Sequence, residues 1–125
     1  MGINLGITTL GDSTLNDIFA GLHPTMEVTN IVIVSGQNLK RGACLGVITA
    51  EANPDKGKYK LWNKNSSDGS EALVGILGCD VDATSADGKG FMYVHGEFLK
   101  DRLTAGHIIV AGVYNNGSIV IKEDK

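Results

Sequence analysis

Glycine is the residue type that most restricts what this chain can fold into. There are 17 glycines among 125 residues, about twice the usual share, whereas aromatic residues make up only 6%. Glycine supplies the positive φ that turns and bulges need, and it is costly inside helices. A chain of this length forms one ordinary domain. The composition therefore predicts a single mainly β domain with short strands and little helix.

Strand signals recur along the chain from Glu27 onwards. They are EVTNIVIV (27–34), ACLGVIT (43–49), YKLW (59–62), EALVGILGCDV (71–81), FMYVHGEF (91–98), HIIVAGVY (107–114) and SIVIK (118–122). SGQN interrupts the pattern after the first of these, LKDRL forms one helical turn, and the apolar run at 71–81 reads as a strand buried on both faces. Asn115, Asn116 and Gly117 predict the turn of a closing hairpin. This spacing, without βαβ alternation, predicts a small antiparallel or mixed β barrel or sandwich.

The first 26 residues differ from the rest, since isolated apolar residues alternate there only weakly with glycines and hydroxyls. We therefore divide the chain into an extended N-terminal arm, residues 1–26, and a β-rich domain, residues 27–125. Ile3, Leu5 and Ile7 alternate with Asn4 and Gly6, which suits a short strand added to the edge of another sheet. A frayed terminus is the alternative. Large apolar side chains at 10, 15, 18 and 19 favour contact with the core or with a partner.

Charge and cysteine usage exclude several classes of partner. A net charge of −3 does not favour binding to nucleic acid, and no segment reaches the roughly 20 apolar residues of a membrane span. The N-terminus does not read as a signal peptide, which indicates a reducing cytoplasm as the place of synthesis. Cys44 and Cys79 lie among apolar residues and are interpreted as buried free thiols. His23, His95 and His107 are too widely spaced for a structural zinc site, so neither metal nor cofactor is expected.

Two other functions have some support in the sequence. His95 and Glu97 share one strand face and could form an acid–base pair, although neither a nucleophile nor a glycine elbow accompanies them. Lys56, in the turn PDKGK, could be the acceptor of a lipoyl or biotinyl carrier domain. We expect that turn not to be a symmetric hairpin tip, and it lacks the usual hydrophobic partner beside the lysine. The chain is therefore predicted not to be an enzyme.

Three segments in series resemble the lambda-type bacteriophage head decoration family. They are SGQNLKRGACLGVIT (35–49), DGSEALVGILGCDVDAT (68–84) and YVHGEF (93–98), and the similarity extends over about residues 24–106. The resemblance implies a small β-rich domain with little helix that forms homotrimers at three-fold positions on expanded heads. It also implies the major capsid protein of a tailed phage as partner and the outer surface of the virion capsid as location.

A protein of this kind needs a rigid core, a symmetric self-interface and a segment that pairs with a capsid sheet edge. We predict capsid contacts from the arm and a trimer interface around the single Trp. The predicted capsid contacts are Ile3, Asn4, Leu5, Ile7, Leu10, Leu15, Ile18 and Phe19, and the predicted trimer contacts are Leu61, Trp62 and Phe91. Deleting residues 2–22 is expected to leave the domain folded and to abolish attachment.

Overall fold

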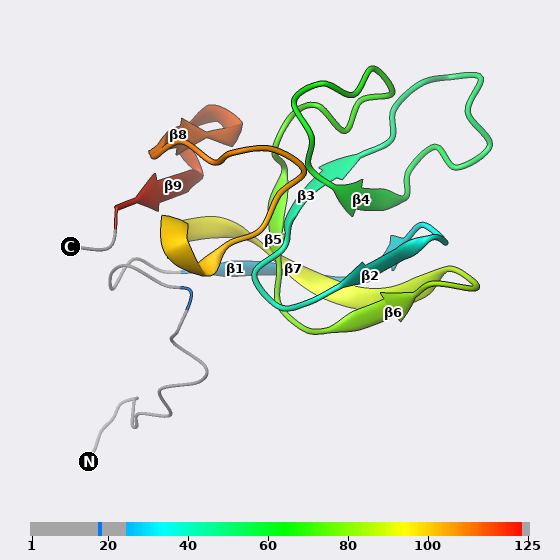
Figure 1. Ribbon diagram of the computed structural model, residues 1–125, viewed down its shortest axis with the longest axis horizontal. Coiled ribbons are helices and arrows are strands. Elements are labelled where there is room, and N and C mark those ends of the chain that lie inside the picture. The colour runs from blue at the N-terminus through cyan, green and yellow to red at the C-terminus, as the bar shows by residue number, and fades with distance from the viewer. Residues whose placement is uncertain (1–17, 19–24, 124–125) are drawn as a thin grey trace, which may run out of the picture.

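The protein is built around a small closed β barrel, seen in the computed structural model, which describes Ile18 and residues 25–123 (Figure 1). Five strands form the barrel in the spatial order β1-β4-β3-β5-β7, and β7 pairs back to β1. Their bounds are β1 Met26–Ile33, β3 Cys44–Val47, β4 Tyr59–Leu61, β5 Gly75–Leu77 and β7 Gly88–Leu99. The prediction of a mainly β barrel with little helix is confirmed.

Strand β7 belongs to two parts of the fold. Its first half pairs antiparallel with β1 and β5, and Gly96 to Leu99 then pair in parallel with β9 (Ile119–Lys122). Gly96 is buried with φ of +149°, and its N–H donates to the carbonyl of Ser118. A residue without Cβ suits this position, since a side chain at that φ would be strained. The strand thus leaves the barrel at Gly96.

The predicted closing hairpin is present, but its first strand is shorter than expected. β8 (Gly112–Tyr114) pairs antiparallel with β9, and the short 3-10 turn η2 (Asn115–Gly117) joins them. Asn115 and Asn116 have φ of +55° and +57°, a conformation that asparagine tolerates better than most residues. In the described chain, Ile108–Val110 lie outside any strand, so the predicted strand 107–114 is formed only at its end.

Two other strand predictions need correction. The apolar run at 71–81 is not one strand, because it divides into β5 and β6 (Val81–Ala83), and β6 pairs with β2 (Gln37–Leu39) in a separate two-stranded sheet. SGQN was expected to interrupt the strand pattern after β1. Because β2 begins at Gln37, that interruption is limited to the turn before β2. The backbone N–H of Arg41 donates to a carboxylate oxygen of Asp80, and its guanidinium donates to the carbonyl of Gly78. These contacts fix the bend between β5 and β6.

The hydrophobic core consists of two neighbouring clusters. One surrounds Phe98 and includes Ile76 from the barrel together with Ile119 and Ile121 from β9. The other fills the barrel between β1, β3 and the second sheet, with Ile33, Leu45 and Leu77 fully buried. The predicted helical turn is the 3-10 turn η1 (Lys100–Arg102), which follows β7. Across the described residues, no helix has the length and apolar character needed to cross a membrane.

Candidate functional site

The predicted capsid contacts fall almost entirely outside the described residues. Ile3, Asn4, Leu5, Ile7, Leu10, Leu15 and Phe19 lie there. Ile18 is described: its side chain is 2% exposed and belongs to the Phe98 cluster, and its carbonyl accepts a hydrogen bond of 2.8 Å from the N–H of Leu99. Ile18 is thus enclosed by this chain's own core. Its role as a capsid contact stays a prediction, whereas its side chain is part of the protomer's hydrophobic core.

The three predicted trimer residues do not form one exposed patch. Trp62 is 5% exposed, its indole N–H donates to the carbonyl of Glu71, and its ring meets those of His107 and Tyr114 edge-on at centroid distances of 4.3 and 5.3 Å. Phe91 is half-buried and packs against the same cluster as Trp62. Leu61 packs against the other cluster. The single Trp is a core residue of the protomer, and the part of these residues in a trimer interface stays a prediction.

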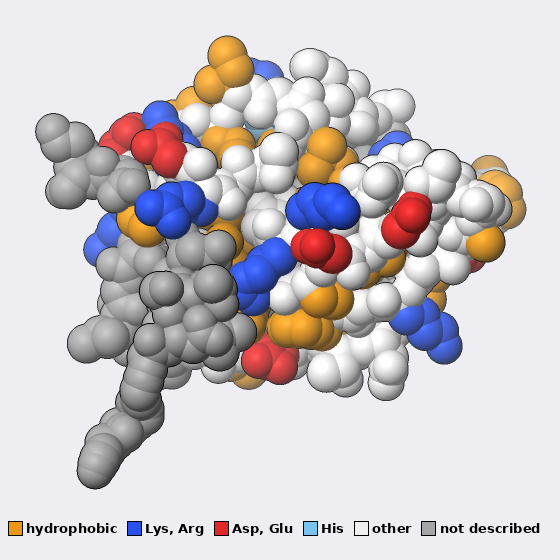
Figure 2. All heavy atoms as spheres, turned by 60° about the horizontal axis from the view of Figure 1, so that its bottom comes forward, with side chains coloured by type: hydrophobic (Ala, Val, Ile, Leu, Met, Phe, Trp, Pro, Cys, Tyr) orange, Lys and Arg blue, Asp and Glu red, His pale blue; other side chains and the backbone are white. Residues whose placement is uncertain are grey.

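The exposed apolar side chains lie elsewhere, and sequence reasoning missed them. Among the described residues, the exposed large hydrophobic side chains are Ile108 at 86%, Val113 at 66%, Val110 at 64%, Met26 at 60% and Val28 at 38%. In Figure 2 hydrophobic side chains form separate groups between scattered charges of both signs. Ile108, Val110 and Val113 come from one short stretch of chain and are called the 108–113 strip below. The sequence did contain a signal for this exposed apolar stretch, because residues 105–121 include no Asp, Glu, Lys or Arg.

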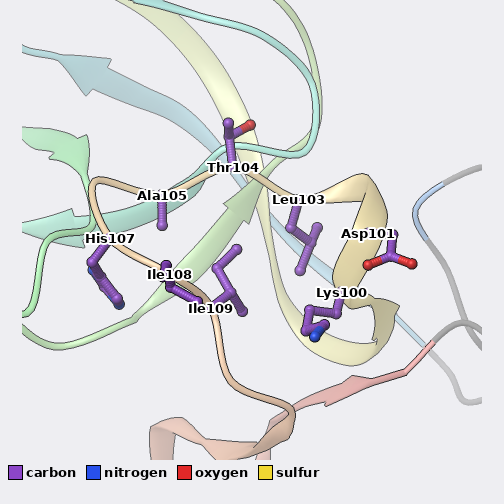
Figure 3. Close-up of a pocket in the computed structure, with 8 residues that line it drawn as sticks. All are labelled: Lys100, Asp101, Leu103, Thr104, Ala105, His107, Ile108 and Ile109. Atoms are coloured by element: carbon purple, nitrogen blue, oxygen red, sulfur yellow. The ribbon is translucent and has the colours of Figure 1, made fainter.

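A shallow groove of about 330 Å³ lies beside this strip (Figure 3). η1 contributes Lys100 and Asp101 at one end, and the following loop contributes the remaining side chains. Those are Leu103, Thr104, Ala105, His107, Ile108 and Ile109. Burial, with a smaller contribution from the charge of Lys64, lowers the pKa of His107, whose Nδ1 accepts a hydrogen bond from the N–H of Lys64. The groove therefore has charged side chains at one end, and the rest of its lining mixes polar and apolar groups.

The turn at Asp68–Ser70, which carries part of the family resemblance, is held by its own hydrogen bonds. The Ser70 hydroxyl and N–H both donate to one carboxylate oxygen of Asp68, and Lys60 pairs with the other at 3.3 Å. The Ser70 bonds first, then the lysine, lower the pKa of Asp68 to about 2. Ser70 is fully buried, and a Cβ added to Gly46 would lie 2.4 Å from its carbonyl oxygen. These residues position the turn against β3 and serve the fold.

A second charged group ties three loops together. Lys58 lies 2.7 Å from a carboxylate oxygen of Asp87 and 3.0 Å from one of Asp55, while the N–H of Ser35 donates to the other oxygen of Asp87. Hydrogen bonding to Asp87 is the largest cause of a raised pKa at Lys58, and the same bond lowers the pKa of Asp87. Because the group lies at the surface, it orders the loops and adds little free energy.

Neither alternative function gains a site from the structure. Glu97 pairs with Lys122 at 2.9 Å across β7 and β9, an arrangement typical of structural charges. Lys56 pairs with Glu51. The loop that carries Lys56 joins the antiparallel strands β3 and β4, and Lys56 lies near its β4 end. Within the described residues, no group of three His, Cys, Asp or Glu side chains could hold a metal ion.

The two cysteines are free thiols in different surroundings. Cys44 is fully buried, and this burial raises its pKa to about 12. A nucleophilic cysteine needs a lowered pKa, so Cys44 has the properties of a core residue. Cys79 is half-buried, so its predicted burial is only partial.

Comparison with known protein families matches residues 12–109 to the family of bacteriophage lambda head decoration protein D. The matched region contains all five strands of the barrel and ends inside the 108–113 strip. A search among curated proteins finds no match.

Proposed function

Since the chain belongs to the bacteriophage lambda head decoration protein D family, it has a phage capsid decoration role, and we propose that it acts as a homotrimeric cement. In this proposal the trimer binds the outer surface of the expanded capsid at three-fold positions and stabilises it against the pressure of the packaged genome. The partner is the major capsid protein of a tailed phage. The family match over residues 12–109 is the observation that carries the proposal.

The physical basis is linkage between binding and lattice stability. A ligand that binds the intact lattice and not its separated subunits stabilises the lattice by mass action. Such a ligand needs a rigid shape, and the closed barrel with two buried clusters supplies one. It needs no reactive group, so the protein is proposed to act without catalysis, metal or cofactor. Its proposed location is the outside of the virion, after synthesis in the host cytoplasm.

The arm is proposed to supply the capsid contact by adding a strand to the edge of a capsid sheet. In strand addition, backbone hydrogen bonds give affinity and alternate side chains enter pockets. Ile3, Leu5 and Ile7 have that alternation. Ile18 is held in the core, so the preceding stretch of about 17 residues reaches at most about 60 Å from that anchor. This reach is enough to cross onto a neighbouring capsid subunit.

Three arms on one trimer would bind far more tightly than one. If a single arm bound with Kd of about 10 μM, and tethering gave the next arm an effective concentration of about 1 mM, each further arm would contribute about a hundredfold. The trimer would then reach a Kd of about 1 nM. Weak single contacts are therefore compatible with stable decoration.

The test is co-sedimentation of the protein with expanded and with unexpanded heads, combined with light scattering of the released protein. We expect saturable binding to expanded heads, at three copies per three-fold position, and heads that resist heat better when occupied. The matched variant is Ile3→Ser, Leu5→Ser and Ile7→Ser together, which should melt like the parent and lose most of the binding. Dimers on the particles, or equal occupancy by the variant, would contradict the trimer or the arm respectively.

A further inference from the structure

One loop packs against the single tryptophan and carries a titratable side chain to it. We call it the loop 105–110, and it comes shortly after η1. The N–H of Gly106 donates to the carbonyl of Trp62 at 2.8 Å, and a Cβ added to Gly106 would lie 2.8 Å from the amide nitrogen of Asn63. The ring of His107 then meets the indole edge-on, with 4.3 Å between the centroids. The loop therefore lies directly on the turn that follows β4.

The next contact between the loop and this turn depends on the protonation state of His107. The backbone N–H of Lys64 donates to Nδ1 of His107 at 3.1 Å. Only an unprotonated ring nitrogen accepts a hydrogen bond, so this contact requires the neutral imidazole with its proton on Nε2. Protonation would place a second N–H opposite the N–H of Lys64. One proton therefore turns an attractive contact into a repulsive one.

The groups around His107 favour the neutral ring. Burial first, and then the charge of Lys64, lower its pKa. From η1, Lys100 and Asp101 line the same groove, at the other end from His107 (Figure 3). Tyr114, the other ring packed on the indole, donates its hydroxyl to a backbone carbonyl. An imidazolium would be attracted to the indole, but it would lose the bond from Lys64 and face a like charge.

We propose that His107 is a pH-sensitive switch: the neutral ring holds the loop 105–110 on the turn after β4, and protonation releases the loop from Trp62. The lowered pKa sets the range. The contact is fully present above a pH of about 6.5, the ordinary pKa of histidine, and is lost as the pH falls below that value towards the lowered pKa. Release uncovers Ile109, which is 9% exposed and belongs to the same cluster as Trp62. This inference does not depend on capsid binding.

Hydrogen exchange of the whole protein at pH 7.5 and pH 5 tests the release, with rates corrected for the intrinsic effect of pH. The peptide spanning 105–112 should exchange faster at pH 5, by up to about fivefold, the factor that one ordinary hydrogen bond contributes to an opening equilibrium. Peptides from β1 should not change. His107→Asn retains an acceptor oxygen close to the position of Nδ1 and does not titrate, so its exchange should be equal at both pH values. The control, His95→Asn, removes a histidine of β7 and should respond as the parent does. A parent that does not respond, or an equal response in His107→Asn, would overturn the proposal.

Nuclear magnetic resonance of the imidazole nitrogens tests the switch in the parent protein, so the test does not depend on the folding of a variant. We expect the Nε2–H tautomer of His107 at pH 7.5 and a titration midpoint below about 6.5. Since Trp62 is the single Trp, quenching of its fluorescence by acrylamide should increase with the same midpoint. An Nδ1–H tautomer, a midpoint above the ordinary value, or quenching that does not follow the midpoint would overturn the proposal.

Discussion

Truncation on either side of Ile18 should separate the folding role of this residue from the proposed binding role of the arm. Removal of residues 2–16 keeps Ile18, whereas removal of residues 2–22 deletes it. The second truncation loses an isoleucine that is 2% exposed, at a cost of about 2–4 kcal/mol, and the hydrogen bond to the N–H of Leu99, at about 1 kcal/mol. At about 4 °C per kcal/mol for a domain of this size, its melting temperature should fall by about 12–20 °C. The structure thus revises the expectation that the longer deletion leaves the domain intact.

Thermal unfolding followed by circular dichroism measures the difference. The truncation of residues 2–16 should melt within a few degrees of the full chain. In the full chain, Ile18→Ala should lose about 3 kcal/mol and Ile18→Val about 1 kcal/mol, which isolates the side chain from the rest of the deleted segment. If both truncations and Ile18→Ala melt together with the parent, the packing of Ile18 in the core is refuted.

Three further predictions concern the barrel and its turns. Trp62→Ala should cost about 3–5 kcal/mol in urea unfolding of the protomer, because the ring is 5% exposed; a variant that keeps its stability but loses trimers would restore Trp62 to the interface. Asp68→Asn should destabilise the protein at neutral pH, and the difference from the parent should vanish between about pH 4 and 2, since a carboxylate whose pKa is lowered to about 2 stabilises the fold only while ionised; a difference independent of pH would contradict this. Gly46→Ala should cost about 1–3 kcal/mol through its contact of 2.4 Å with the Ser70 carbonyl, whereas Gly112→Ala, with its nearest neighbour at 3.8 Å, should change the unfolding midpoint little.

The strands that sequence patterns predicted well are those with local signals. β1 follows from its β-branched residues, β7 from its aromatic residues and the β8–β9 hairpin from the Asn-Asn-Gly turn, because these signals act between neighbouring residues. The division of 71–81 into β5 and β6 depends instead on Arg41, which lies some forty positions away in sequence. A window read along the chain contains no information on that partner.

The burial of Trp62 in the protomer was not predicted, for a related reason. Trp62 was chosen because tryptophan is common in interface cores, but the same property suits a protomer core, and the ring contacts with His107 and Tyr114 lie far away in sequence. The strip had a readable signal in its lack of charge. Its segment was nevertheless interpreted as a paired strand, because alternation predicts extended backbone and does not identify what the extended backbone pairs with.

The seam between β1 and β7 has a consequence for synthesis. Ile33 lies opposite Gly88 and Met26 opposite His95, so the barrel closes between its first strand and a strand made long afterwards. Pairings so distant in sequence form slowly, and on the ribosome they wait until the later strand has left the exit tunnel. A chain that terminates early, before Gly88, lacks one side of the seam. Incomplete chains should therefore remain unfolded and should not bind the capsid lattice. Closure of the barrel thus restricts assembly to full-length molecules.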